Sequence, residues 1–538
     1  MNSVFEVFQA TTERYPEASF LCVPARAERD YYPEGAEFSY HWMAEHALEA
    51  ARCYAEAGYG PGHRIALLLE NRPAFFVHYL ALNSLGVSIV PVNPDYRHDE
   101  IVYQLEHADA VLVVGISTRL ADLEKASREC PLQPPVIDQS TLPGQDPPRA
   151  LTARRSSATA PGRDTECAML YTSGTTGRPK GCILTNDYFL TGGEWYLALG
   201  GQLTMEPGHE RVLNPLPLYH MNALAVTATA MLCSGGCLIS PDRFHPKSWW
   251  QDVIATQATV IHYLGVVPPL LLNLPPAPEE TQHSVKFGIG AGIDPDHHAA
   301  FEARFGFPMV EVWGMTETGR IYADNHEPRT IGSRAFGKAV TGLEARVVDE
   351  HDQDVAPGTA GELVVRHNAD DPRRGFFSAY YKNENATREA WHGGWFHTGD
   401  TVRQDEKGML YFVDRNKNII RRSGENISAA EVEATLQIHE TVAQAAVIGV
   451  PDELREEEVF ACIVVMPGEG IVSDSARILF DWCMARLAYF KAPGYILFCD
   501  TLPTTGTQKV QKTQIFSPDT DPRTLPGVID FRAYKRRD

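Results

Sequence analysis

Short apolar runs alternate with longer stretches of helical spacing through the first two-thirds of the chain. Such alternation is typical of parallel sheets covered by helices on both faces. Residues 73–85 and 99–107 have the helical spacing, and Pro73 suits the first turn of a helix. The predicted buried strands are residues 64–69, 88–91, 110–114, 258–262, 285–289 and 308–312. These patterns predict an α/β fold.

The pattern changes beyond about residue 340. Residues 343–349 and 361–366 predict strands of a β-rich subdomain. The last part predicts a separate α+β unit, with helices at 429–438 and 473–487 and strands at 445–450 and 459–465. We therefore expect a large N-terminal domain, residues 1–416, in which parallel α/β subdomains precede the β-rich subdomain. A small C-terminal domain, residues 417–538, would follow it.

Two long segments carry no clear secondary-structure pattern. Residues 141–164 are rich in Pro, Ser, Ala, Gly and Arg, which predicts an exposed connection. No Asp, Glu, Lys or Arg lies between Arg211 and Asp242, but prolines and the Gly235–Gly236 pair interrupt this apolar stretch. It predicts a buried strand, loop and helix better than a membrane span.

Charge and cysteine content narrow the class of protein. The 538 residues include 48 basic and 69 acidic ones, a net charge of −21 that disfavours a nucleic-acid or anionic-membrane surface. The ten cysteines lack paired metal-binding spacing and fit reduced thiols. The first residues lack a basic n-region. We expect a cytoplasmic protein without a signal peptide, membrane span or nucleic-acid partner.

The segment from Tyr171 to Gly181, Tyr-Thr-Ser-Gly-Thr-Thr-Gly-Arg-Pro-Lys-Gly, carries the strongest chemical signal. It follows the apolar run 167–170 and combines three glycines, four hydroxyl side chains and a lysine. Glycines let backbone N–H groups converge on an anion, and the other side chains add donors and positive charge. The segment is not a Walker loop, because Pro179 stands where the second glycine would be. It predicts a polyphosphate-binding loop.

This loop and four later motifs resemble those of the adenylate-forming superfamily, which includes acyl-CoA synthetases, luciferases and peptide-synthetase adenylation domains. The later motifs are Trp313-Gly-Met-Thr-Glu317, Trp395-Phe-His-Thr-Gly-Asp400, Asp414-Arg415 with Gly424-Glu-Asn426, and the segment ending at Lys509. Their order spans most of the chain. The resemblance implies an enzyme that activates a carboxylate with ATP to an acyl-AMP.

The resemblance assigns the ATP contacts. Asp400 would accept hydrogen bonds from the ribose hydroxyls, Arg415 would reach the ribose or phosphate, and a structural ion pair is the alternative for both. Thr316 would contact the α-phosphate, and Glu317 would be the protein's Mg²⁺ ligand. Trp313, Gly314 and Met315 would border the adenine, with Gly290, Ala291 and Gly292 opposite. The predicted phosphate-loop residues are Thr172, Ser173, Gly174, Thr175, Thr176, Gly177 and Lys180.

The resemblance also implies a mobile C-terminal domain. Lys509 would neutralise charge during adenylation, and Lys417 best matches the hinge about which the domain turns. The turn would then bring Gly424, Glu425 and Asn426 to the site, where Gly424 leaves room for the pantetheine of CoA. Gln508 departs from the usual Thr-Gly-Lys pattern, which puts the flexibility of that loop in doubt.

Four residues are candidates for the wall of the acyl pocket. His220 resembles the family's gate between the acyl pocket and the CoA tunnel, although a satisfied core histidine is the alternative. Met221 and Gly265, together with Gly290, complete the predicted wall. The glycines at 265, 288, 290 and 292 suggest a roomy pocket, but glycine also serves backbone turns.

We predict an acyl-CoA synthetase: a carboxylic acid, as the small-molecule substrate, reacts with ATP and CoA to give acyl-CoA, AMP and pyrophosphate, with Mg²⁺ as cofactor. The sequence around residues 394–400 and 420–428 looks most like carnitine/crotonobetaine and medium-size acid ligases. An amino-acid-activating domain would need an acidic residue near position 220, and His220-Met-Asn offers none. A non-catalytic nucleotide sensor would be expected to lose Lys509 or Glu317, and this chain keeps both. A luciferase-type oxygenase stays open, as does assembly as a homodimer.

Overall fold

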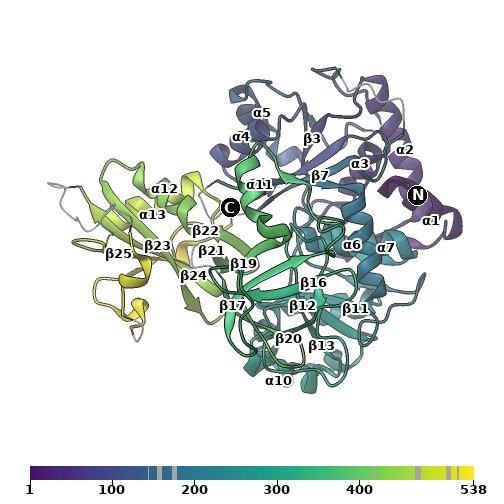
Figure 1. The fold of residues 1–538 in the computed structure, drawn as a ribbon. Coiled ribbons are helices and arrows are strands. Elements are labelled where there is room, and N and C mark those ends of the chain that lie inside the picture. Colours follow the sequence, from purple (N-terminus) through teal and green to yellow (C-terminus); the bar gives the residue numbers. More distant parts are fainter. Residues whose placement is uncertain are drawn as a thin grey trace. The chain divides into compact units, whose positions relative to one another are not determined.

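The computed structural model describes residues 1–142, 144–153, 160–172, 178–415, 419–466, 474–503, 510–517 and 520–537 (Figure 1). They form two compact units. The first comprises Met1–Pro94, Gln104–Leu170 and Gly181–Asp414, and the second comprises Asp95–Tyr103, Tyr171–Lys180 and Arg415–Asp538. The predicted domain boundary between residues 416 and 417 lies outside the described residues and stays a prediction.

A seven-stranded sheet forms the first layer of the N-terminal region. Its order is β18-β8-β7-β4-β3-β5-β6, and its core pairs β3 with β4 and β5 in parallel. Every residue of β4 and β5 is buried, as expected for strands covered on both faces. The strands are β3 (Arg64–Leu68), β4 (Ser88–Pro91), β5 (Leu112–Gly115), β6 (Val136–Asp138), β7 (Glu166–Thr172), β8 (Lys180–Thr185) and β18 (Ala379–Tyr380).

An eight-stranded sheet carries the segments predicted to bind adenosine. Its order is β14-β13-β12-β11-β9-β10-β1-β2, and β9 to β13 pair in parallel. The strands are β1 (Ser19–Val23), β2 (Ala36–Ser39), β9 (Arg211–Leu213), β10 (Cys237–Ile239), β11 (Val260–Leu264), β12 (Phe287–Ala291), β13 (Met309–Trp313) and β14 (Tyr322–Ala323).

Helices of the N-terminal region accompany these sheets (Figure 1). The π-helical segment η2 (Asn222–Ala228) leads directly into α7. The α-helices are α1 (Val4–Arg14), α2 (Tyr40–Glu56), α3 (Pro73–Ser84), α4 (His98–His107), α5 (Leu120–Glu129), α6 (Asn186–Ala198), α7 (Thr229–Ser234), α8 (Trp249–Ala255), α9 (Val267–Leu272), α10 (Pro295–Phe305) and α11 (Glu384–Ala390).

The predicted β-rich subdomain is a five-stranded sheet of order β15-β20-β19-β17-β16. Its strands β16, β17 and β19 pair antiparallel, and β15 pairs antiparallel with β20. The strands are β15 (Ala335–Lys338), β16 (Glu344–Val348), β17 (Ala360–Arg366), β19 (Phe396–Gln404) and β20 (Met409–Arg415). The sheet brings residues 362, 397 and 400 onto adjacent strands.

The C-terminal part of the second unit is a mixed sheet whose order is β22-β21-β24-β25-β26, with β23 paired to β24. Helices α12 (Ala429–Gln437) and α13 (Ser475–Arg486) share one apolar core with β23 and β24 (Figure 1). The strands are β21 (Ile419–Arg422), β22 (Glu425–Ser428), β23 (Val442–Asp452), β24 (Glu456–Val465), β25 (Tyr495–Phe498) and β26 (Ile529–Asp530).

Most predicted elements exist, with shifted ends. The predicted strand 258–262 is β11 at Val260–Leu264, and 110–114 is β5 at Leu112–Gly115. The predicted strand 445–450 extends to Val442–Asp452, because β23 forms a long hairpin with β24. The charge-free stretch forms β9, η2, α7 and β10, as the prediction of a buried strand, loop and helix required. Within the described residues, no helix is long and apolar enough to cross a membrane.

Candidate active site

The predicted phosphate loop joins two neighbouring strands. Thr172 ends β7, and Lys180 begins β8. Between them, Ser173, Gly174, Thr175, Thr176 and Gly177 lie outside the described residues. At the end of the loop, the carbonyl of Pro179 accepts a hydrogen bond from the Tyr103 hydroxyl at 2.7 Å. The apolar run 167–170 lies within β7, so the loop begins at the carboxyl end of a sheet strand, where α/β folds commonly bind ligands.

Glu311 organises the predicted adenine loop. This residue lies on β13, and its buried carboxylate accepts hydrogen bonds from the backbone N–H of Gly292 (2.5 Å) and of Ile293 (3.2 Å). The Tyr263 hydroxyl, from β11, donates to the same carboxylate at 3.1 Å. Glu311 therefore fixes the backbone that follows Ala291. Glu311 was not among the predicted site residues, although a lone acid in the apolar run 309–313 is a usable signal.

The free energy of unfolding should depend on pH through Glu311. Burial raises the pKa of this carboxyl to about 7 from its ordinary 4.5. The folded protein therefore binds the proton more tightly than the unfolded chain between these pH values. The stability that Glu311 contributes is full below pH 4.5 and is lost as pH rises through about 7, a loss of ~3 kcal/mol.

Denaturant unfolding of the wild type and of Glu311→Gln from pH 5 to 8 measures this term. Gln cannot accept from both Gly292 and Ile293, so the variant should be less stable at pH 5. The difference in free energy of unfolding between the wild type and the variant should then decrease by ~3 kcal/mol towards pH 8, because only the wild type loses stability at this position. A difference that does not change with pH would contradict the raised pKa.

Gly290 is required by the packing of strands. It pairs with Tyr263 of the parallel strand β11, and a Cβ at position 290 would lie 2.1 Å from the Tyr263 carbonyl oxygen. At Gly288 a Cβ would lie 2.3 Å from the Met309 sulfur. Gly292 has a positive φ of +83°, which disfavours other residues. Backbone conformation and close packing thus explain these three glycines. This is the alternative to a roomy pocket that the sequence analysis left open.

Gly290→Ala should destabilise the N-terminal unit by ~3 kcal/mol or more, because the clash is with backbone that is held in a sheet. Gly162→Ala is the matched control, since a Cβ there meets no atom within 4 Å. Thermal unfolding of both variants beside the wild type tests the expectation. Equal midpoints for the two variants would show that the sheet absorbs the extra methyl group.

The predicted adenosine residues Trp313 and Asp400 meet in the structure. Trp313 ends β13, and its Nε1–H donates to Asp400 Oδ2 at 2.8 Å. Both side chains are buried, and the Trp313 ring packs near Tyr322 and Phe336. Two motifs separated by 87 residues thus contribute to one place. Arg415 ends β20, but its side chain lies outside the described residues.

The turn after Trp313 is held from several sides. The Thr318 hydroxyl donates to the carbonyl of Met315 at 2.9 Å, and the Tyr188 hydroxyl donates to the carbonyl of Thr316 at 2.7 Å. A Cβ at Gly314 would lie 2.7 Å from the Ile321 side chain, so the turn approaches the next segment closely. The backbone around Thr316 is therefore fixed before any ligand binds.

Glu317 is buried, and its Oε1 accepts a hydrogen bond from the Tyr380 hydroxyl at 2.8 Å. Burial, with Glu317 as the next cause, raises the pKa of Tyr380 well above its ordinary value, so the phenol remains a donor. A carboxylate oxygen is the hard ligand that Mg²⁺ prefers. Glu317 therefore fits the predicted metal ligand in its chemistry and is held by a neighbour that the sequence did not reveal.

The predicted acyl-pocket residues lie beside a buried polar network. His220 and Met221 directly precede η2, whose first residue is Asn222. Asn214 donates to Asn222 at 3.0 Å and to the Thr227 hydroxyl at 2.9 Å. His262, on β11 and three residues before Gly265, continues the network. Its Nε2 lies 2.8 Å from the Tyr196 hydroxyl and 3.3 Å from that of Thr227.

His262 is a neutral hydrogen-bonding group. It is 1% exposed, and burial lowers its pKa to about 3. Its Nδ1 has no hydrogen-bond partner among the described residues. The sequence analysis did not predict His262, because one histidine in an apolar strand resembles an ordinary core residue.

The C-terminal candidates lie in the second unit. Gly424 has a φ of +87° in the tight turn between β21 and β22, a conformation that glycine adopts without strain. Glu425 and Asn426 begin β22, opposite Arg422 and Arg421. Lys417 and Lys509 lie outside the described residues. Around Lys509, Gln511 N–H donates to the Pro503 carbonyl at 2.8 Å, and Leu502 and Val510 pack in one cluster.

Comparison with known families finds a large N-terminal and a smaller C-terminal family match, in the order that the sequence predicted. Residues 8–381 match the model of the AMP-binding enzymes, and residues 431–509 match that of the AMP-binding enzyme C-terminal domain. The chain belongs to the AMP-binding enzyme family. The predicted membership of the adenylate-forming superfamily is thereby confirmed.

Similar curated proteins are CoA ligases. A sulfoacetate–CoA ligase of Cupriavidus necator is 32% identical over 512 residues, which cover 94% of this chain and 95% of the relative. A crotonobetaine/carnitine–CoA ligase of Proteus mirabilis is 28% identical over 501 residues, 89% of this chain and 93% of the relative. The predicted class, an ATP-dependent, AMP-forming acid–CoA ligase, is confirmed.

Solved structures support the fold. An o-succinylbenzoate CoA synthetase from Bacillus subtilis has a TM-score of 0.80 at 24% identity. The match covers 96% of this chain and 98% of that synthetase. An amide bond synthetase from Marinactinospora thermotolerans has the same TM-score at 23% identity, with 96% and 99% covered. The predicted α/β fold with a large N-terminal and a smaller C-terminal part is confirmed.

Proposed function

We propose that this acyl-CoA synthetase activates a short carboxylic acid that carries a polar or charged substituent. The acid's carboxylate would attack the α-phosphorus of ATP, giving acyl-AMP and pyrophosphate, and the CoA thiol would then displace AMP. The observation that carries the proposal is the full-length similarity to a sulfoacetate–CoA ligase. The crotonobetaine/carnitine ligases support it, because their named acids are also small and carry a second polar or charged group.

In this proposal the buried pair of Trp313 and Asp400 binds adenosine. Trp313 orients the Asp400 carboxylate by its hydrogen bond, so that the other carboxylate oxygen can accept from ribose hydroxyls. Glu311 holds the loop of Gly290, Ala291 and Gly292 against the other face of the base. Preorganised donors and acceptors of this kind need no rearrangement when ATP binds.

The triphosphate would lie on the loop between Thr172 and Lys180, with Thr316 at the α-phosphate. Glu317 would be a ligand of Mg²⁺, held in orientation by Tyr380. Bound there, Mg²⁺ would neutralise part of the phosphate charge. Lys509 would act in adenylation, Lys417 would be the hinge, and the turn at Gly424 would accept the pantetheine of CoA.

The polar network beside His220 and Met221 supports a polar acid. A hydrocarbon tail beside this network would leave His262 Nδ1, which has no hydrogen-bond partner among the described residues, still unpaired, which is costly. A substituent with hydrogen-bonding atoms would instead meet partners. The neutral His262 can supply a hydrogen bond without its own charge.

Thr227→Val should shift acid preference. It removes the hydroxyl that contacts Asn214 and His262 but keeps the shape of the side chain. We expect kcat/KM for the polar acid to fall ~10-fold, while an apolar acid of equal length changes little. Thr229→Val is the matched control, because Thr229 is similarly buried but its hydroxyl donates to the Leu224 carbonyl. Equal changes in kcat/KM for both acids would show that the network does not take part in substrate recognition.

A pyrophosphate-release screen tests the function. The acids would include sulfoacetate, crotonobetaine and carnitine beside unsubstituted short, branched, aromatic and polycyclic acids, each with and without CoA. The proposal expects release that requires one small polar acid, with full turnover only when CoA is present. Preference for an unsubstituted acid would contradict the proposed substrate class. Equal turnover with and without CoA would contradict CoA as the acyl acceptor.

A further inference from the structure

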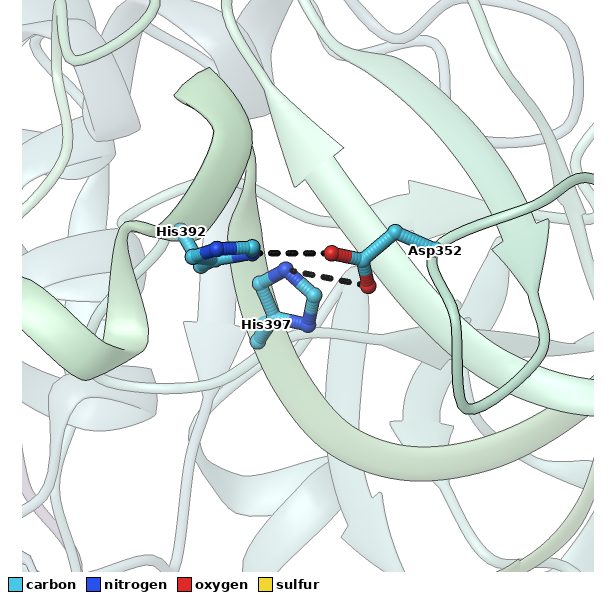
Figure 2. Close-up of side chains that lie close together, drawn as sticks. All are labelled: Asp352, His392 and His397. Atoms are coloured by element: carbon cyan, nitrogen blue, oxygen red, sulfur yellow. Dashed lines mark hydrogen bonds and ion pairs between the residues drawn. The ribbon is translucent and has the colours of Figure 1, made fainter.

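Two histidines and an aspartate from separate segments of the β-rich subdomain meet at one point. Asp352 lies in the turn between β16 and β17, His392 lies in the short turn η5 (His392–Gly394), and His397 is on β19. Figure 2 shows both imidazole rings directed at the Asp352 carboxylate. In the part of the chain that the structure describes, this is the one group of three or more His, Cys, Asp or Glu side chains with metal-ligand spacing.

The distances suit a small metal ion. His392 Nδ1 lies 2.8 Å from Asp352 Oδ2, and His397 Nε2 lies 3.8 Å from Asp352 Oδ1. One ligand atom from each residue lies within 4.8 Å of the others. Ligand atoms ~2.0–2.2 Å from tetrahedral zinc lie about 3.3–3.6 Å apart, so small side-chain rotations would close the site. His392, whose side chain is 72% exposed, has the freedom to make this adjustment.

A carboxylate already orients the most enclosed of the three ligands. His397 Nδ1 lies 3.1 Å from Glu362 Oε2, and the ring therefore presents Nε2 to Asp352. A metal-binding imidazole is typically held through its other nitrogen by such a partner. Glu362 is itself fixed, because its Oε1 accepts the Gly399 N–H at 2.9 Å.

The turn that carries Asp352 is also preformed. Asp349 Oδ1 accepts the N–H groups of His351 (2.9 Å) and Gln353 (3.0 Å) on either side of Asp352. Arg346 donates to the Asp352 carbonyl at 3.2 Å and is paired with Asp354 at 2.6 Å. Asp352 and Glu362 together can supply the two negative charges that balance a divalent cation.

We propose that Asp352, His392 and His397 bind Zn²⁺, with Glu362 as the residue that orients His397. Two imidazole nitrogens and one carboxylate oxygen are ligands that zinc accepts, and a water molecule would complete the coordination. This site is separate from the predicted Mg²⁺ ligand Glu317. It lies at the start of β19, the strand that carries Asp400, and Glu362 also holds Gly399, the neighbour of Asp400.

Isothermal titration of the full-length, chelator-treated protein with ZnCl₂ tests the site, and Co²⁺ replaces Zn²⁺ for visible spectroscopy. We expect one equivalent of zinc and the absorption of four-coordinate cobalt. His392→Ala and Glu362→Gln should each weaken zinc binding ~10–100-fold. His351→Ala, which removes a 78% exposed histidine from the same turn, should leave it unchanged.

Three results would overturn the proposal. The first is no stoichiometric zinc binding by the wild type. The second is equal binding by the wild type and by the His392→Ala/His397→Ala double variant, which would place the ion elsewhere. The third is an equal loss in His351→Ala. Circular dichroism of each metal-free variant separates loss of a ligand from loss of the fold. His392→Ala alters an exposed side chain and should therefore disturb the fold least.

Discussion

Lys509→Ala is expected to lower the rate of acyl-AMP formation by ~10²–10³-fold or more. Charge builds up between the acid's carboxylate and the α-phosphate as the new bond forms, and a positioned ammonium group stabilises it. Thioester formation from supplied acyl-AMP does not involve that charge. It should change less than about 10-fold.

The two half-reactions must be measured separately for this prediction. Pyrophosphate exchange into ATP reports adenylation, and acyl-CoA formation from synthetic acyl-AMP reports the second step. Lys512→Ala is the matched control: it removes a lysine three positions away whose Nζ is paired with Glu433 at 2.7 Å. Equal losses in both half-reactions of Lys509→Ala, or an equal loss of adenylation in Lys512→Ala, would contradict the role of Lys509.

Sequence patterns predicted the fold well where strands are buried on both faces. Residues 64–69 and 88–91 form such strands because an uninterrupted apolar run has few other stable positions in a soluble α/β fold. The ends of other strands were displaced by about two residues. Register is set by the neighbouring strand, as between β11 and β12, and no local pattern contains that information.

The candidate site was predicted as far as short motifs reach. Trp313 and Asp400 were both predicted as adenosine residues, and the structure brings them to hydrogen-bonding distance. The residues that hold Thr316 and Glu317 were not predicted, because Tyr188 and Tyr380 act through contacts that are distant in sequence. Asp352, His392 and His397 escaped notice for the same reason: their spacing resembles no linear metal motif, and only the antiparallel pairing of the β-rich subdomain brings the three segments together.

Asp400→Ala should raise the KM for ATP by ~100-fold. The buried carboxylate is proposed to accept hydrogen bonds from ribose hydroxyls, and hydrogen bonds to a charged group are worth about 1.5–3 kcal/mol each. The variant also leaves the Trp313 Nε1–H without its 2.8 Å acceptor. Trp313→Phe separates the two effects, because it keeps the carboxylate and removes the donor that orients it, together with part of the ring that borders the adenine; we expect a ~10-fold rise.

Deoxynucleotides make this test specific. The wild type should use 2′-deoxy-ATP or 3′-deoxy-ATP less well than ATP, since each analogue lacks one of the ribose hydroxyls that are proposed to donate to Asp400. Asp400→Ala should discriminate far less among the three nucleotides, because the acceptor itself is gone, and a purely structural effect of the substitution would leave the discrimination intact. Trp313→Phe should keep part of it. Full discrimination in Asp400→Ala would mean that the carboxylate anchors Trp313 and that the ribose is bound by other residues.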